Sequence, residues 1–262
     1  MQFVSDDKNA YICKAISQQT KFRTEMERER LYYSSQDREL SLSAAFPALM
    51  RKVYIWMTLA LSITGITAYG VASSPNLIMA IATNSGLMWG IIIGTFALVM
   101  IISSAINRLS LTTATLLFTL YSVLNGMMLS SIFLVYTMSS IAQVFFITAG
   151  TFAVMAAVGY FTKTDLTSFG KLLFMALIGL VIATIVNIFM KSGTMGLIIS
   201  YVGVLIFVGL TAYDSQKIKQ MLMSCDDVTE NSQKLALLGS LTLYLDFLNL
   251  FLYLLRIFGR RE

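Results

Sequence analysis

The sequence has 262 residues, of which 56% are hydrophobic and 13% charged, whereas ordinary soluble domains have about 25% charged residues. Sixteen of its 33 Lys, Arg, Asp and Glu residues lie within the first 52 positions. The rest of the chain cannot cover a water-exposed surface with polar groups, so we expect a polytopic membrane protein surrounded by lipid.

Several function classes are excluded by what the sequence lacks. It contains no His, which excludes Ser-His-Asp and Cys-His catalysis, His-ligated zinc or haem, and an imidazole pH switch. Cys13 and Cys225 are far apart in polar segments and predict reduced thiols rather than a disulfide framework. There is no GxxxxGK phosphate-binding loop, which argues against ATP-driven transport. The net charge of +5 comes from basic residues beside apolar segments, so it indicates membrane topology and not a nucleic-acid partner.

Residues 1–46 are polar and of mixed charge, and no apolar run follows the first Met, so we expect a cytosolic tail without a cleavable signal peptide. The stretch 21–40 predicts either a short solvated helix or a frayed segment. Pro47 and the pair Arg51–Lys52 are expected to end this region. The remainder, 47–262, is expected to form the membrane domain.

Seven apolar segments follow, each near the ~20 residues that a bilayer-spanning helix needs. Together they predict an all-α membrane protein with a bundle of seven transmembrane helices, since these runs are too long and too apolar for a β-barrel. The expected segments are 53–73, 87–106, 112–136, 140–161, 170–190, 194–222 and 234–257.

The basic residues predict the orientation. With the N-terminus inside, cytosolic segments collect fifteen Lys and Arg residues and the opposite side collects four, which favours a cytosolic N-terminus. The four are Lys191, Arg256, Arg260 and Arg261. These residues conflict with the rule that basic residues stay in the cytosol. Either the basic C-terminus is exported or the seventh segment does not fully cross the membrane. We favour crossing.

Gly86, Gly90 and Gly94 form a GxxxGxxxG row on the second segment. Glycines on one helical face let another helix approach closely, so we expect a packing face, with a mobile sliding contact as the alternative.

Asp214 and Asp246 are the candidate functional residues, because acids inside membrane helices are costly and usually face a partner, water or an ion. Their midpoint, residue 230, lies in the polar turn between the last two segments. Antiparallel helices folding back there bring both carboxyl groups to one depth, roughly 15–20 Å into the membrane. We therefore expect them to be neighbours.

Two close carboxyl groups in a low dielectric cannot both be ionised cheaply, so one holds or shares a proton, which makes a proton-sensitive latch. When both ionise they repel or require a cation, and their hard oxygens suit transient Ca²⁺ binding, although two carboxylates are a thin coordination shell. The alternative pairs Asp214 with Lys217, and Asp246 with Asn249 or a neighbouring helix. A polar stripe on the last helix supports a wet or hydrogen-bonded face around Asp246: Thr242, Asn249 and Tyr253.

Two long motifs closely resemble the Bax inhibitor-1 (transmembrane Bax inhibitor motif) family, most of all its bacterial branch. The first runs from Gly209 to Lys219 and includes Ala212-Tyr-Asp214. The second is Leu243-Tyr-Leu-Asp246-Phe-Leu-Asn249, followed by Leu254-Leu-Arg256-Ile-Phe-Gly259. The resemblance covers about residues 50–260 and leaves out the tail.

The resemblance implies a seven-helix bundle with the last helix central, acting as a pH-sensitive calcium leak channel in the bacterial inner membrane. Its proton sensor corresponds to Asp214 and Asp246, and its gate latch to Arg108, for which a simple topology marker is the other interpretation. Calcium is then the permeant ion, and no cofactor is expected.

Two further function classes differ in the support that the sequence gives them. A non-transporting interaction protein, such as a stress-response protein or a regulator of a membrane protease, is the alternative that the charged tail supports. An enzyme is not expected, because neither Tyr213-Asp214 nor Leu245-Asp246 supplies the Gly-Asp type motif of intramembrane aspartyl proteases.

Overall fold

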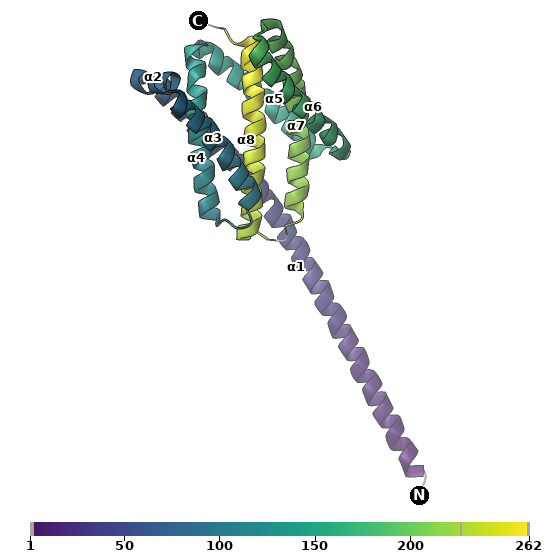
Figure 1. Ribbon diagram of the computed structural model, residues 1–262. Coiled ribbons are helices and arrows are strands. Elements are labelled where there is room, and N and C mark those ends of the chain that lie inside the picture. Colours follow the sequence, from purple (N-terminus) through teal and green to yellow (C-terminus); the bar gives the residue numbers. More distant parts are fainter. Residues whose placement is uncertain (1–2, 226, 261–262) are drawn as a thin grey trace.

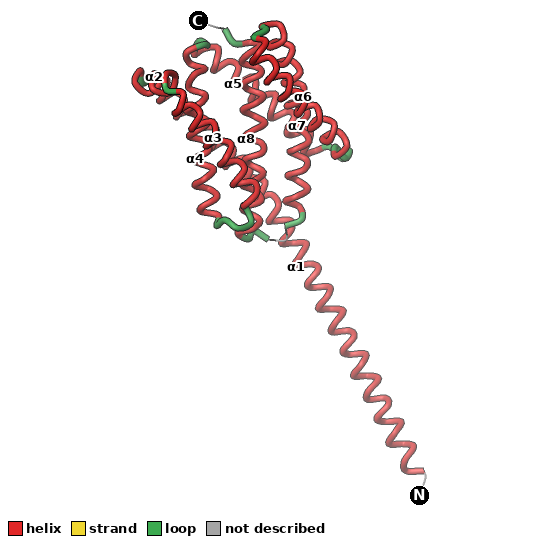
Figure 2. The backbone as a smooth tube through the Cα atoms, viewed as in Figure 1, coloured by secondary structure: helices red, strands yellow, loops and turns green. Residues whose placement is uncertain are grey.

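The computed structural model describes residues 3–225 and 227–260. The described elements are all helical and form a bundle from which one long helix projects (Figures 1 and 2). They are α1 (Phe3–Ala72), α2 (Pro75–Thr83), α3 (Ser85–Ala105), α4 (Leu111–Leu129), the 3₁₀ helix η1 (Ser130–Leu134), α5 (Met138–Phe161), α6 (Thr167–Met190), α7 (Gly193–Met223) and α8 (Glu230–Phe258).

Seven of these helical stretches are long and apolar enough to cross a membrane by length and composition, which confirms the predicted fold class. They are Ala45–Ala72, Ser85–Ala105, Leu111–Leu134, Met138–Phe161, Thr167–Met190, Gly193–Met223 and Glu230–Phe258. The helix α2 was not predicted, because its nine residues are too few to show a periodic pattern. Pro75 is its first residue, a position where the missing N–H of proline costs nothing.

The helix α1 is continuous over 70 residues and extends well beyond the bundle (Figure 1). The stretch 21–40 is therefore helical, and its described charged side chains, Arg23 and Glu25 among them, are exposed. Pro47 lies inside the helix, so the change from polar to apolar composition expected there is not accompanied by a break in the helix. The helix continues there although proline has no N–H for the carbonyl four residues earlier. Ala45 is the first described residue of α1 that is buried.

The core of the bundle lies around α7 and α8. In their most apolar stretches 56% and 61% of the residues are buried, against 11% in α6. The helix α8 packs against α1, α4, α5 and α7, so the last helix is central, whereas α6 packs against α7 at the edge of the bundle.

A buried chain of hydroxyl groups ties α1, α4 and α8 together. Tyr244 of α8 has an exposed fraction of 0%, and its hydroxyl lies 2.8 Å from the Thr64 hydroxyl of α1. Thr64 in turn donates to the carbonyl of Ser122 in α4 over 3.0 Å, which leaves Tyr244 as the donor to Thr64. The hydroxyl protons of Tyr244 and Thr64 thus each have an acceptor, as their burial requires.

The row of Gly86, Gly90 and Gly94 is not a close-packing face, so that prediction is wrong. A Cβ at Gly90 would meet open space, and one at Gly86 only the side chain of the helix's own N-cap, Asn84. At Gly94 it would make an ordinary contact with Leu124 at 3.5 Å. Gly86 and Gly90 are exposed, and only Gly94 lies against another helix, at Leu124 of α4.

The close helix approaches occur at other glycines. A Cβ at Gly126 of α4 would lie 2.7 Å from the Thr64 carbonyl oxygen of α1. A Cβ at Gly159 of α5 would run into the Ala212 carbonyl of α7. Only a residue without a side chain fits at such crossings.

Candidate functional site

The candidate site is a pair of carboxyl groups between the two central helices. Asp214 of α7 and Asp246 of α8 lie within hydrogen-bonding reach of each other through their side chains. Asp246 is only 5% exposed, and no described N–H or O–H group donates to its Oδ2. Two carboxylates have no proton to share, so a hydrogen bond between these groups would require one proton on the pair.

The pair is brought together by the hairpin of α7 and α8, as its spacing predicts. The chain turns between Met223 and Glu230. Thr229 caps α8 by accepting a hydrogen bond from the Ser232 backbone N–H at 3.3 Å. The Ser232 hydroxyl donates back to the Asp227 carbonyl at 2.8 Å, which fixes the turn.

Two glycines hold α7 and α8 close on either side of the pair. Toward the turn, a Cβ at Gly239 of α8 would lie 3.0 Å from the Ile218 side chain of α7. Toward the other end, a Cβ at Gly203 of α7 would lie 2.8 Å from the Tyr253 ring of α8. Close approach above and below the carboxyl groups keeps them in contact.

The alternative partners of the two aspartates, Lys217 and Asn249, make other contacts instead. Lys217 acts on Asp214 through its charge, but its Nζ lies 5.8 Å from the Tyr213 ring centroid and forms no described ion pair with Asp214. Asn249 donates to the Leu245 carbonyl at 2.8 Å, so its amide nitrogen satisfies its own helix rather than Asp246.

The predicted polar stripe on α8 is half-buried. Thr242 donates to the Leu238 carbonyl of its own helix at 3.2 Å. The Tyr253 ring stacks on Phe207 of α7 with 5.8 Å between the centroids, and its hydroxyl contacts the side chain of Thr184 in α6. These groups support the packing around the pair and do not bond to it.

Arg108 is not brought to the pair. It is exposed in the loop between α3 and α4. Three residues later, the Leu111 N–H donates to Glu230 at the start of α8. Glu230 is sixteen residues from Asp246, which corresponds to about 24 Å of helix. An arginine side chain does not span that distance, so the latch contact is not formed in this arrangement.

The metal-binding capacity of the pair is small. Within the described part of the chain, no group of three or more His, Cys, Asp or Glu residues is placed to hold a metal ion. Two carboxylates offer hard oxygen ligands, but Ca²⁺ takes six to eight oxygens. Any ion at the pair would have to keep most of its water.

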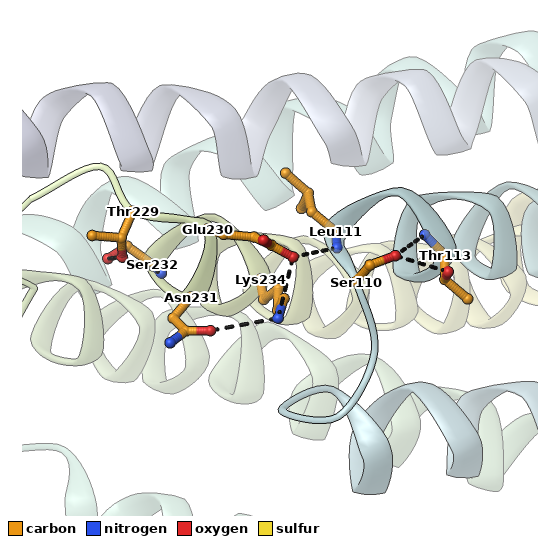
Figure 3. A network of polar contacts seen from close by, with 8 residues as sticks. All are labelled: Ser110, Leu111, Thr113, Thr229, Glu230, Asn231, Ser232 and Lys234. Carbon is orange, nitrogen blue, oxygen red and sulfur yellow. Dashed lines mark hydrogen bonds and ion pairs between the residues drawn. The ribbon is translucent and has the colours of Figure 1, made fainter.

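A polar network near the turn was missed by the sequence reasoning (Figure 3). The Oε1 atom of Glu230 accepts from the Leu111 N–H at the start of α4 over 2.9 Å. The same atom lies 3.4 Å from the Nζ of Lys234, whose side chain is 10% exposed. Asn231 also contacts Lys234, at 3.4 Å. The sequence shows that Glu230 and Lys234 have opposite charges four residues apart. It gives no sign of the hydrogen bond that joins Glu230 to α4.

A second missed set of contacts attaches the α5–α6 loop to α7. The Gln216 side chain accepts from the Leu166 N–H and donates to the Thr164 carbonyl, both over 2.8 Å. Lys219 donates to the Tyr160 carbonyl at 2.7 Å. In the same loop, hydrogen bonds from the Thr167 hydroxyl and N–H hold the pKa of Asp165 below its usual value.

Comparison with known proteins identifies the family to which this arrangement belongs. The family described as "Inhibitor of apoptosis-promoting Bax1" matches residues 47–262. The chain belongs to the Bax inhibitor-1 family. The match leaves out the projecting part of α1 and includes both aspartates.

Bacterial relatives of this Bax inhibitor-1 family member are similar over most of their length. The chain is 50% identical to "Inner membrane protein YbhL" of Escherichia coli K12 over 220 residues, which cover 84% of this chain and 94% of the relative. It is 47% identical to an uncharacterized protein of Borreliella burgdorferi, over 81% of this chain and 92% of the relative. An uncharacterized protein of Rickettsia prowazekii is 42% identical, over 81% and 89%.

These relatives and the seven apolar helices establish a multi-pass inner membrane protein. The resemblance seen in the two aspartate motifs is thereby confirmed at the level of the family and the membrane.

Proposed function

We propose that this protein is a pH-sensitive leak channel for cations, with Ca²⁺ as the preferred ion, gated by the carboxyl pair of Asp214 and Asp246. The observation that carries the proposal is the contact of these two groups between the central helices, where Asp246 is buried. Protons and calcium are then its ligands, with the N-terminus in the cytosol.

The physical basis is the number of protons on the pair. With one proton the two groups attract each other and hold α7 against α8. Without it, two negative charges meet in a low dielectric, where they repel or take up a cation. Either response changes the contact between the two helices that form the centre of the bundle, so loss of the proton is the gating event.

The test is Ca²⁺ flux into liposomes that contain the purified protein, at pH 6 and pH 8. The wild type should give fluxes that differ between the two pH values. Asp214→Asn and Asp246→Asn remove the shared titration while keeping the side-chain size, so their flux ratio between the two pH values should approach one. Asp227→Asn, an exposed position in the turn, is the matched control and should behave as the wild type.

Two results would contradict the proposal. Both Asn variants retaining the wild-type pH ratio would remove the pair from gating. A wild type that gives no Ca²⁺ flux above empty liposomes at either pH would remove the channel itself.

A second candidate is a non-transporting interaction protein, such as a regulator of a membrane protease. It is favoured by the projecting part of α1, whose described charged side chains are exposed (Figure 1). Deleting residues 1–44, which ends just before Ala45, the first described residue of α1 that is buried, distinguishes the two. A channel should keep its Ca²⁺ flux, whereas a protein that works through its projecting helix should lose its partner in crosslinking experiments in cells.

A further inference from the structure

A cationic cavity lies at the opposite end of the bundle from the α7–α8 turn. It has a volume of about 310 Å³ and is lined by residues from the end of α6, the start of α7 and the end of α8. This volume is at the lower limit of ordinary ligand sites, which span about 300–1,000 Å³. The carboxyl pair does not line it, so the cavity is separate from the proposed gate.

The charge of the cavity is positive. Lys191 and Arg256 line it, and none of the described residues around it is Asp or Glu. Both cations are exposed, and neither has an ion-pair partner within residues 3–225 and 227–260. The first turn of α7 also borders the cavity through Ser192 and Gly193. Its N–H groups carry the partial positive charge of a helix N-terminus.

The backbone holds Lys191 at the cavity in an uncommon conformation. Its φ of 52° makes it the only non-glycine residue with a positive φ in the described part of the chain. Gly or Asn is the usual choice at such a helix end. The turn alone therefore does not call for a lysine at this position.

One acceptor in the cavity also lacks a partner. The Oδ1 atom of Asn187 is buried and receives no hydrogen bond from the described residues. Asn187 and Arg256 face each other across Gly196, where a Cβ would lie 3.4 Å from the Asn187 Nδ2 atom and 3.9 Å from the guanidinium. A ligand that satisfies this site must bring negative charge and at least one O–H or N–H donor.

The surroundings indicate where such a ligand comes from. Lys191 joins two membrane-spanning helices and Arg256 lies two residues before the end of α8, so the cavity is at the depth of a membrane interface. Two large apolar side chains that line it are exposed, Ile188 at 64% and Leu197 at 47%. They provide a surface for acyl chains directly next to the charged cavity.

We infer that this cavity binds the phosphate headgroup of an anionic phospholipid, with the phosphate between Lys191 and Arg256 and a headgroup hydroxyl donating to Asn187. Phosphatidylglycerol supplies both groups. The site also accounts for two of the four basic residues that the topology rule disfavours at this end of the chain.

Native mass spectrometry of the full-length protein in a neutral detergent, with equal amounts of phosphatidylglycerol and phosphatidylcholine, tests the assignment. The wild type should retain phosphatidylglycerol preferentially. Lys191→Asn, which suits the backbone, and Arg256→Gln should each lower that preference about fivefold, the contribution expected of one basic residue near an anionic lipid. Lys171→Gln, an exposed lysine of α6 outside the cavity, is the matched control and should leave the preference unchanged.

A variant at Gly196 distinguishes binding inside the cavity from nonspecific attraction to positive surface charge. Gly196→Leu fills the cavity and leaves both cations in place, so it should lose the preference as well. Gly196→Ala fits at ordinary contact distances and, with thermal melting of every variant, controls for folding. Full retention of the preference in folded Gly196→Leu, or in folded Lys191→Asn and Arg256→Gln together, would overturn the site.

Whether the phosphate group in the cavity belongs to a soluble ion rather than to a lipid is tested separately. Inorganic phosphate added to lipid-free protein should raise the melting temperature less than phosphatidylglycerol does at the same concentration. An equal or larger effect of inorganic phosphate, abolished by Arg256→Gln, would overturn the lipid as the ligand.

Discussion

The crossing of α5 and α7 at Gly159 gives a sharp stability prediction. A Cβ at Gly159 would run into the backbone of Ala212, with 2.7 Å to the carbonyl carbon and 2.9 Å to Cα. Carbon atoms pack at about 3.5–4.0 Å, so the helices would have to separate by about 1 Å. No flexible side chain can give way there, so the steric overlap created by Gly159→Ala should cost about 1–3 kcal/mol, partly offset by the higher helix propensity of alanine.

The control removes the contribution of helix propensity. Alanine favours the helix over glycine by up to about 1 kcal/mol wherever it is placed. Gly150 lies on the same helix, and a Cβ there would meet open space. The difference between Gly159→Ala and Gly150→Ala is therefore the steric cost alone, about 1–3 kcal/mol.

The measurement is the free energy of unfolding from SDS titration in mixed micelles, followed by the fluorescence of Trp56 and Trp89. Equal stability of the two variants would refute the steric reasoning and the close crossing itself. Gly90→Ala should match Gly150→Ala, because the glycine row on α3 faces open space at that position. A large loss of stability in Gly90→Ala would instead indicate that the glycine row is a packing face.

Three further outcomes are expected. Tyr244→Phe removes the donor to the Thr64 hydroxyl and should lower the free energy of unfolding by about 1 kcal/mol, measured by the same titration. Glu230→Ala should speed hydrogen exchange of the Leu111 amide, which loses its acceptor; unchanged exchange would contradict that tie. Because the folded pKa of Asp165 is depressed, its stabilisation of the α5–α6 loop is present above the unfolded value of 3.8 and declines as the pH falls through the folded value. Asp165→Asn should remove that pH dependence of amide exchange in the loop, and an unaltered profile would argue against it.

The helices of the membrane domain were predictable because each is a long apolar run. The carboxyl pair was predictable as well, since antiparallel helices that turn near residue 230 place positions 214 and 246 at similar depth. Both inferences depend on length and spacing, which the sequence states directly.

The features that were missed depend on which helix faces lie together. The glycines at 86, 90 and 94 have the right spacing for packing, yet the close approaches occur at single glycines such as Gly159, which has no motif around it. Likewise, Glu230 bonds to a backbone N–H 119 positions away, and no local pattern predicts such a contact. Pro47 does not interrupt α1, because a long helix tolerates one missing hydrogen bond.

The peripheral position of α6 has a consequence for how the protein can change over time. Its buried residues are Gly170, Leu173 and Leu180, and most of its remaining surface faces lipid, where one apolar side chain substitutes for another at little cost. We expect natural variation and tolerated replacements to concentrate on that helix, while α8, enclosed by four neighbours, accepts few.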